Sequence, residues 1–164
     1  MKNFALIGVG GYIAPRHLKA IHDTGNQLLA STDPFDSVGI LDKYFDNVKY
    51  FKEFERFDRH IEKERRKGAN NHIDYVSICS PNYLHDSHIR FALRVGADAI
   101  CEKPLVLNPW NLDALSEIES ESENKIYNIL QLRTHPSIVK LKEKVDNAKK
   151  AKKYNIDLTD SKLE

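Results

Sequence analysis

The sequence lacks the features that mark several specialised classes of protein. Its 164 residues include two cysteines, Cys79 and Cys101, and 25 basic against 24 acidic residues, a net charge of +1. Two cysteines without a CxxC pair exclude a disulfide scaffold, and without a basic excess no nucleic-acid partner is expected. No apolar run approaches the ~20 residues of a membrane-spanning helix, so no membrane partner is expected either.

The N-terminus also lacks the apolar stretch and the small-residue cleavage site of a signal peptide. The mean hydropathy of −0.53 and the 41 % share of hydrophobic residues are typical of a soluble globular chain. We therefore expect a cytoplasmic protein with reduced thiols. His85 and His88 form an H-x-x-H pair, but no third ligand follows at a recognisable spacing, and no metal site is expected.

Short apolar runs alternate along the chain with longer amphipathic stretches. The expected strands are residues 4–7, 28–32, 48–51, 74–79, 98–101 and 126–132. The expected helices are residues 13–24, 36–45, 53–67, 84–95, 108–123 and 136–150. This alternation predicts the α/β class, a doubly wound parallel sheet (Rossmann fold) with strand order 3-2-1-4-5-6. Its ligand crevice should lie at the carboxyl ends of the first and fourth strands.

A glycine-rich turn, Gly8-Val9-Gly10-Gly11, follows the first strand and opens the first helix. In this context the first glycine permits a tight turn, the second lets the backbone approach a pyrophosphate, and the helix N-terminus offers free N–H groups. Ile13 replaces the third glycine of G-x-G-x-x-G. Either the helix–strand packing tolerates a larger side chain there, or the loop is shifted. A plain glycine turn is the alternative.

Asp33 ends the second strand. An acid at this place in a dinucleotide-binding sheet accepts hydrogen bonds from the adenosine ribose hydroxyls. Its charge would repel a 2′-phosphate and no arginine follows it, which favours NAD over NADP. The alternative is that Asp33-Pro34 is only a turn.

The run Ser80-Pro81-Asn82 ends the fourth strand, beside the expected crevice. Pro81 keeps the backbone extended, and Ser80 or Asn82 can cap the helix that follows. Capping alone is the alternative to a role in ligand binding.

The run Glu102-Lys103-Pro104 ends the fifth strand. Because neighbouring strand residues point to opposite faces, Glu102 is not automatically the ion partner of Lys103. Pro104 restricts Lys103 to an extended backbone, and a cis bond between them is possible. Near a nicotinamide, Lys103 could polarise or deprotonate a substrate hydroxyl. The alternative is an ordinary surface lysine.

Together these motifs resemble the glucose–fructose oxidoreductase/inositol dehydrogenase (Gfo/Idh/MocA) family, over about residues 1–150. The segments that carry the resemblance are residues 8–17 (GVGGYIAPRH), Asp33, residues 80–85 (SPNYLH), residues 102–105 (EKPL) and residues 131–133 (QLR). The run Tyr-Ile-Ala-Pro-Arg-His is similar to the branch that oxidises UDP-N-acetylglucosaminuronic acid at C3 for lipopolysaccharide O-antigen.

The resemblance implies NAD as the cofactor and a sugar nucleotide as the substrate of the complete enzyme, which would be a homo-oligomer. It implies a catalytic role for Lys103 between nicotinamide and sugar, with Lys103 and Arg133 binding the substrate. The implied cofactor-binding residues are Gly8, Gly10, Gly11, Tyr12, Ile13, Asp33, Ser80, Pro81, Asn82, Leu84, His85, Glu102, Lys103 and Gln131.

The family also implies a second, antiparallel-sheet domain that binds the sugar and supplies a catalytic histidine. We expect residues 1–150 to form the NAD-binding domain and residues 151–164 to begin a truncated substrate domain, so that this chain alone is inactive. One alternative is a non-catalytic NAD-binding or interaction module. It could pair with another chain through residues 140–153, which contain seven lysines and two acids, or through the final segment of the chain. Another is a family member that acts on inositol or a free sugar.

Overall fold

The computed structural model describes residues 1–36, 39–68 and 72–151, with side chains of the last helix described up to residue 147. The chain divides into two compact units, Met1–Ile129 and Leu130–Glu164, and each is described here by itself. The expected boundary at residue 150 stays a prediction, and residues 152–164 lie outside the described part.

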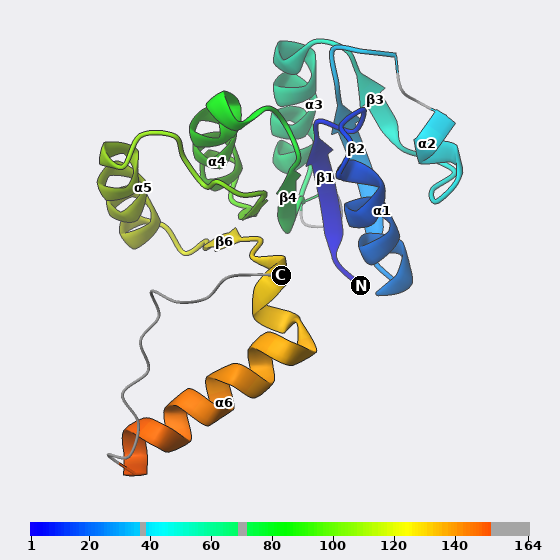
Figure 1. Ribbon diagram of the computed structural model, residues 1–164. Helices are drawn as coiled ribbons and strands as arrows, with labels where there is room; N and C mark the ends of the chain where they lie inside the picture. The colour runs from blue at the N-terminus through cyan, green and yellow to red at the C-terminus, as the bar shows by residue number, and fades with distance from the viewer. Residues whose placement is uncertain (37–38, 69–71, 152–164) are drawn as a thin grey trace. The chain divides into compact units, whose positions relative to one another are not determined.

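The first unit contains a six-stranded parallel sheet in the order β3-β2-β1-β4-β5-β6 (Figure 1). This order confirms the predicted doubly wound topology, in which the direction of winding reverses between β1 and β4. The strands are β1 (Asn3–Ile7), β2 (Gln27–Thr32), β3 (Lys49–Phe51), β4 (Tyr75–Ile78), β5 (Asp98–Cys101) and β6 (Ile126–Asn128).

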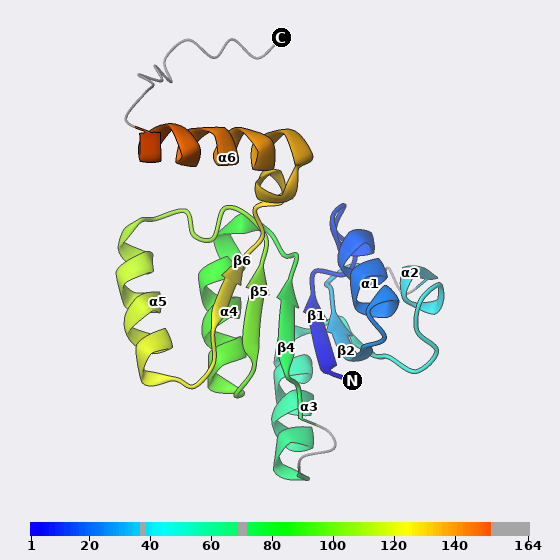
Figure 2. The ribbon, with the colours of Figure 1, turned by 90° about the horizontal axis from the view of Figure 1, so that it is seen from below.

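Helices cover both faces of this sheet (Figure 2). On one face lie α1 (Ala14–Asp23) and α2 (Gly39–Asp42). On the other lie α3 (Phe54–Arg66), α4 (His85–Arg94) and α5 (Trp110–Glu121). A 3₁₀ turn, η2 (Asn82–Leu84), precedes α4.

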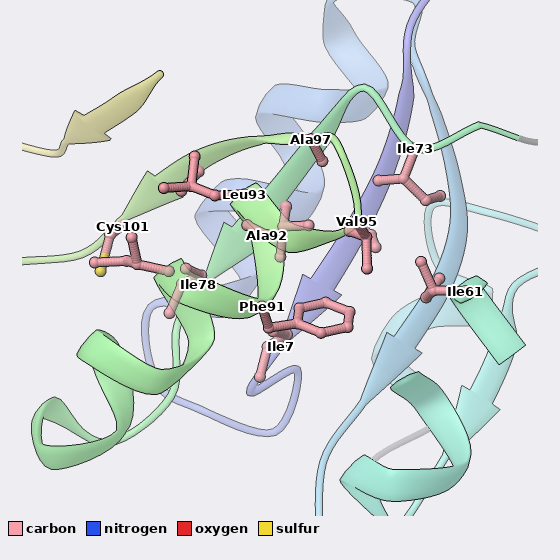
Figure 3. Close-up of a cluster of buried hydrophobic side chains, with 14 of the residues drawn as sticks. Ile7, Ile61, Ile73, Ile78, Phe91, Ala92, Leu93, Val95, Ala97 and Cys101 are labelled. Atoms are coloured by element: carbon pink, nitrogen blue, oxygen red, sulfur yellow. The ribbon is translucent and has the colours of Figure 1, made fainter. Parts of the chain in front are cut away.

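The alternation of side chains along β1 divides the core into two layers. Ala5 and Ile7 point to the α3–α4 face, where Figure 3 shows Ile7 close to Phe91. Phe4 and Leu6 point to the α1 face. Because both faces are buried, residues 4–7 of this strand are all apolar, which explains the continuous run in the sequence.

Two elements end well before the residue at which the sequence predicts their end. The sixth strand was expected over residues 126–132 but ends at Asn128. The chain then enters a 3₁₀ turn, η3 (Gln131–Thr134), where the Thr134 hydroxyl donates to the carbonyl of Gln131 at 3.0 Å. Such a local bond competes with strand pairing. Of the helix expected over residues 36–45, the structure describes α2 alone, which ends at Asp42. Just after this end, the N–H groups of residues 44 and 45 both bond to the Leu41 carbonyl.

The second unit consists of η3 and α6 (Pro136–Ala151) in its described part. The apolar side chains of α6 are exposed within this unit, Ile138 to 41 % and Leu141 to 51 %. No helix of the described residues is long and apolar enough to cross a membrane.

Candidate functional site

The glycine turn packs directly on the end of β4. Gly8 has φ +86°, and a Cβ there would lie 2.6 Å from the backbone of Cys79 and Ser80. A Cβ on Gly11 would lie 3.1 Å from the Cys79 carbonyl. Ala14, the first residue of α1, is completely buried, whereas Ile13 is half-buried. The small residues Gly11 and Ala14 therefore lie where the start of α1 packs closely on the sheet, and the turn can accommodate Ile13 in place of a third glycine.

The N-terminus of α1 suits an anion. No side chain caps it, and its first turn holds no acid. Pro15 lies in that turn, as the sequence predicts. The N–H groups of Ala14 and Arg16 donate to the carbonyls of Gly11 and Ile13. The positive end of the helix dipole still favours a phosphate at this place.

Asp33 follows β2 and lies against the glycine turn. Its Oδ2 accepts the N–H of Gly10 at 2.8 Å, and its Oδ1 accepts the N–H of Phe35 at 2.9 Å. The bond to Phe35 closes a turn, and a turn alone was the alternative interpretation of Asp33-Pro34. Each carboxylate oxygen can accept two bonds, so the Asp33 carboxylate retains capacity for ribose hydroxyls.

A cavity of about 510 Å³ lies at the carboxyl ends of β1, β2 and β4. Its volume is within the range of small-molecule sites. The predicted residues that line it are Gly8, Gly10, Gly11, Asp33, Ser80, Pro81 and Leu84. Sequence reasoning missed the other functional candidates in its wall, which are Phe35, Lys52, Phe54, Tyr83 and His88.

His88 is the most constrained of the missed residues. Its Nδ1 lies 2.8 Å from the Ser80 hydroxyl, and its ring stacks on Phe54 with the ring centroids 4.8 Å apart. Burial, together with the nearby His85, lowers the pKa of His88 to about 4. The signal was present, because His85, His88, Ile89 and Ala92 share one helical face.

Ser80 and Asn82 do not cap the following helix, contrary to the expectation. Neither η2 nor α4 has a side-chain cap. The Ser80 hydroxyl turns inward to His88 instead, and Asn82 is the first residue of η2 with an exposed side chain.

His85 connects the turn after β4 to the turn after β5. The residue is completely buried, with Nδ1 2.7 Å from the Pro104 carbonyl and Nε2 2.9 Å from the Ser80 carbonyl. The Lys103–Pro104 bond is cis. The ring nitrogens of His85 and Nδ1 of His88 thus contact other groups of the protein. No cluster of three metal-ligating side chains occurs in the part of the chain that the structure describes.

Glu102 and Lys103 diverge at the end of β5, as the strand alternation predicts. Glu102 is buried, and its Oε1 lies 2.9 Å from His17 Nε2. Lys103 is exposed, and no described carboxylate forms an ion pair with it. The Asn128 amide donates to the carbonyls of Cys101 and Glu102 at 3.2 and 3.4 Å, which helps to fix the backbone that carries Lys103.

Six predicted site residues of the first unit do not line this cavity, namely Tyr12, Ile13, Asn82, His85, Glu102 and Lys103. Tyr12 is 90 % exposed at the start of α1. Gln131 and Arg133 lie on η3 in the second unit, where both are exposed. Their roles stay predictions.

The sequence profile described as "Oxidoreductase family, NAD-binding Rossmann fold" (GFO_IDH_MocA) matches residues 2–129. The chain belongs to the Gfo/Idh/MocA oxidoreductase family. Its first unit is accordingly a Rossmann domain with NAD as its cofactor. The uncapped helix, the glycine positions that exclude a Cβ and the acid at the end of β2 fit that cofactor.

Similar proteins in this family include dehydrogenases of known structure. The WlbA (WbpB) dehydrogenase from Thermus thermophilus, in complex with NAD and UDP-GlcNAcA, is 48 % identical with a TM-score of 0.86, over 90 % of this chain and 47 % of that one. An uncharacterized oxidoreductase, YgjR, from Escherichia coli (strain K12) is 24 % identical over 93 % of this chain and 44 % of its own length. The chain therefore spans about half the length of these relatives.

Proposed function

We propose that this chain is the cofactor-binding half of an NAD-dependent sugar-nucleotide dehydrogenase. The reaction would be oxidation at C3 of a UDP-N-acetylglucosaminuronic acid (UDP-GlcNAcA) type of substrate, for lipopolysaccharide O-antigen. The observation that carries the cofactor role is the contact of Asp33 with Gly10 at the mouth of the 510 Å³ cavity. The substrate class is supported by the 48 % identity to the WlbA dehydrogenase crystallised with UDP-GlcNAcA.

The cofactor, when bound, supplies a hydride acceptor. Asp33 would accept hydrogen bonds from the adenosine ribose, and the turn from Gly8 to Gly11 would hold the pyrophosphate against the start of α1. Lys52 also lines the cavity, but its ammonium is paired with Asp36 at 2.8 Å. With Asp33 beside the ribose, this arrangement favours NAD over NADP.

Lys103 is the proposed catalytic residue of this half. Its ammonium would donate to the oxygen of the substrate hydroxyl and stabilise the negative charge that develops as the hydroxyl proton passes to a base, the histidine that the family supplies from its second domain. Both flanking residues are anchored through their carbonyls, Glu102 to Asn128 and Pro104 to His85. An anchored backbone beside an exposed side chain suits a lysine that must reach a bound substrate.

The 164 residues alone should bind NAD and turn over little substrate. Orientation of the reacting groups can contribute effective molarities of roughly 10⁵–10⁸ M, and the sugar would have few contacts on this half. We also propose a cytoplasmic location and, for the longer protein, a homo-oligomer. The two thiols, Cys79 and Cys101, are both free and buried, which agrees with a reducing compartment.

A chimera tests the catalytic role of this half. Residues 1–129 would replace the matching segment of the Thermus thermophilus WlbA dehydrogenase, and NADH formation would be followed with UDP-GlcNAcA, myo-inositol and glucose. The chimera should oxidise UDP-GlcNAcA, and Lys103→Met should reduce kcat by about 10²-fold or more. Lys67→Met, at an exposed lysine paired with Glu64, is the matched control. A folded chimera that binds NAD but stays inactive would instead favour the non-catalytic module.

A further inference from the structure

His17 connects the helix that follows the glycine turn to the ends of two central strands. Its Nδ1 lies 2.7 Å from the Ser77 hydroxyl on β4, and its Nε2 lies 2.9 Å from Glu102 Oε1 just after β5. The side chains of His17 and Glu102 are only 11 % and 9 % exposed.

The register of the sheet explains why these groups meet. Ser77 on β4 is paired with Ile100 on β5. Glu102 follows Ile100 by two residues, and positions two apart in a strand share one face. Ser77 and Glu102 therefore both point to the α1 side. His17 lies three residues after the buried Ala14 and one before the buried Leu18, on the inner face of α1.

The chemistry of the partners sets the direction of the hydrogen bonds. A carboxylate only accepts, so His17 Nε2 carries a proton and donates to Glu102. When the ring is neutral, Nδ1 accepts from the Ser77 hydroxyl, and this fixes both the tautomer and the orientation of the ring. The Ser77–His17–Glu102 triad thus holds one carboxylate oxygen of Glu102 in place.

The other carboxylate oxygen is left with a weak contact. Among the residues that the structure describes, Oε2 accepts only from the backbone N–H of Lys103, at 3.3 Å. It lies at the carboxyl end of β5, beyond β4 from Asp33. A dinucleotide in this fold crosses the point between β1 and β4, with its adenosine toward β2. The nicotinamide half therefore falls on the side of Glu102.

We propose that His17 is a positioning residue for the nicotinamide half of the cofactor. It holds Glu102 so that Oε2 accepts a hydrogen bond from a hydroxyl of the nicotinamide ribose. It also ties this carboxylate, and with it the start of the Lys103 turn, to the helix that receives the pyrophosphate. The inference rests on the proposed function, because it requires NAD to lie across the ends of β1 and β4.

Calorimetric titration of the full chain with NAD and with ADP tests this role. ADP has the adenosine and the diphosphate but lacks the nicotinamide ribose. His17→Ala should weaken NAD binding about tenfold, the typical effect of losing one hydrogen bond to a charged group, and leave ADP binding within about twofold. His22→Ala, at an exposed histidine of the same helix, should change neither affinity and serves as the matched control.

Two conservative variants separate positioning from a purely structural role. The amide of His17→Gln can reach the place of Nε2 and donate to Glu102, so it should restore the affinity for NAD. The shorter His17→Asn can replace only the contact to Ser77, so it should resemble His17→Ala. In a Glu102→Ala background, His17→Ala should cause no further loss, because the two residues act through one contact.

The outcomes are distinct. If the unmodified chain binds neither NAD nor ADP, the proposed function fails. Two outcomes would overturn the role of His17 alone, provided that the unmodified chain binds both NAD and ADP. In the first, His17→Ala lowers the two affinities equally. In the second, His17→Asn restores NAD binding and His17→Gln does not. Should His17→Ala not fold, Glu102→Ala decides, since an unchanged ratio of NAD to ADP affinity in that variant would also overturn the proposal.

Discussion

Asp33 is the residue on which the cofactor site depends most. It links the end of β2 to the glycine turn through the N–H of Gly10, and it faces the cavity. Asp33→Ala removes both this link and the acceptor for the ribose, so the affinity for NAD should fall at least about tenfold. Asp42→Ala, at an exposed acid of α2, should leave the affinity unchanged. Calorimetry on the two variants measures the difference, and equal affinities would remove Asp33 from the site.

His88 should make the stability of the domain depend on pH. Burial lowers the pKa of His88 to about 4, against about 6.5 in the unfolded chain. Between these values the unfolded state binds the additional proton, so stability is present above pH 6.5 and is lost as the pH falls toward 4. The loss from this group should be about 2 kcal/mol between pH 7 and pH 5.

Urea unfolding at pH 7 and pH 5 measures the contribution of His88 to this loss of stability as a difference between variants. His88→Gln should show a smaller loss than the unmodified chain, whereas His22→Gln, at an exposed histidine, should show the same loss. An identical pH dependence in His88→Gln and the unmodified chain would mean that His88 does not titrate as proposed.

The two cysteines should be inert in the folded protein. Burial and the nearby Glu102 raise the pKa of the Cys101 thiol to about 12, and the same causes raise that of Cys79 further. Because the thiolate is the reactive form, a maleimide or iodoacetamide at pH 8 should label neither residue in the native state and both in denaturant. Rapid native labelling, detected by mass spectrometry, would contradict this burial.

At the scale of elements, the β1–α1 turn depends on the end of β4. A Cβ on Gly8 would meet the backbone of Cys79 and Ser80 at 2.6 Å, and the positive φ adds strain. Gly8→Ala should therefore lower the free energy of unfolding by roughly 3 kcal/mol or more. Gly39→Ala, where a Cβ would have no neighbour within 4 Å, should change it by less than about 1 kcal/mol. Equal stabilities of the two variants in urea would contradict the packing of this turn.

The elements were predictable where a single local pattern decides them. The apolar run of β1, the amphipathic face of α3 and the predicted strand order were all confirmed. The end of β6 was not predictable, because Ile129 and Leu130 continue the apolar run. The turn that follows is held by backbone hydrogen bonds and by one from the Thr134 hydroxyl.

At the scale of the whole domain, the sequence predicted the residues of the cofactor turn better than the contacts behind them. Gly8, Gly10 and Asp33 are close in the fold because the topology brings strand ends together, and a motif records this. His17 contacts Ser77 and Glu102, which lie 60 and 85 positions further along the chain. No local pattern encodes such pairs, although the place of His17 on the inner face of α1 was visible.

The central claim is that this chain holds NAD in the crevice beside Asp33, and titration of the unmodified chain with NAD and NADP tests it most directly. NAD should bind at least about tenfold more tightly, because the 2′-phosphate of NADP would meet the buried carboxylate of Asp33. Binding of NADP with equal or higher affinity, or no binding of either dinucleotide, would contradict the account.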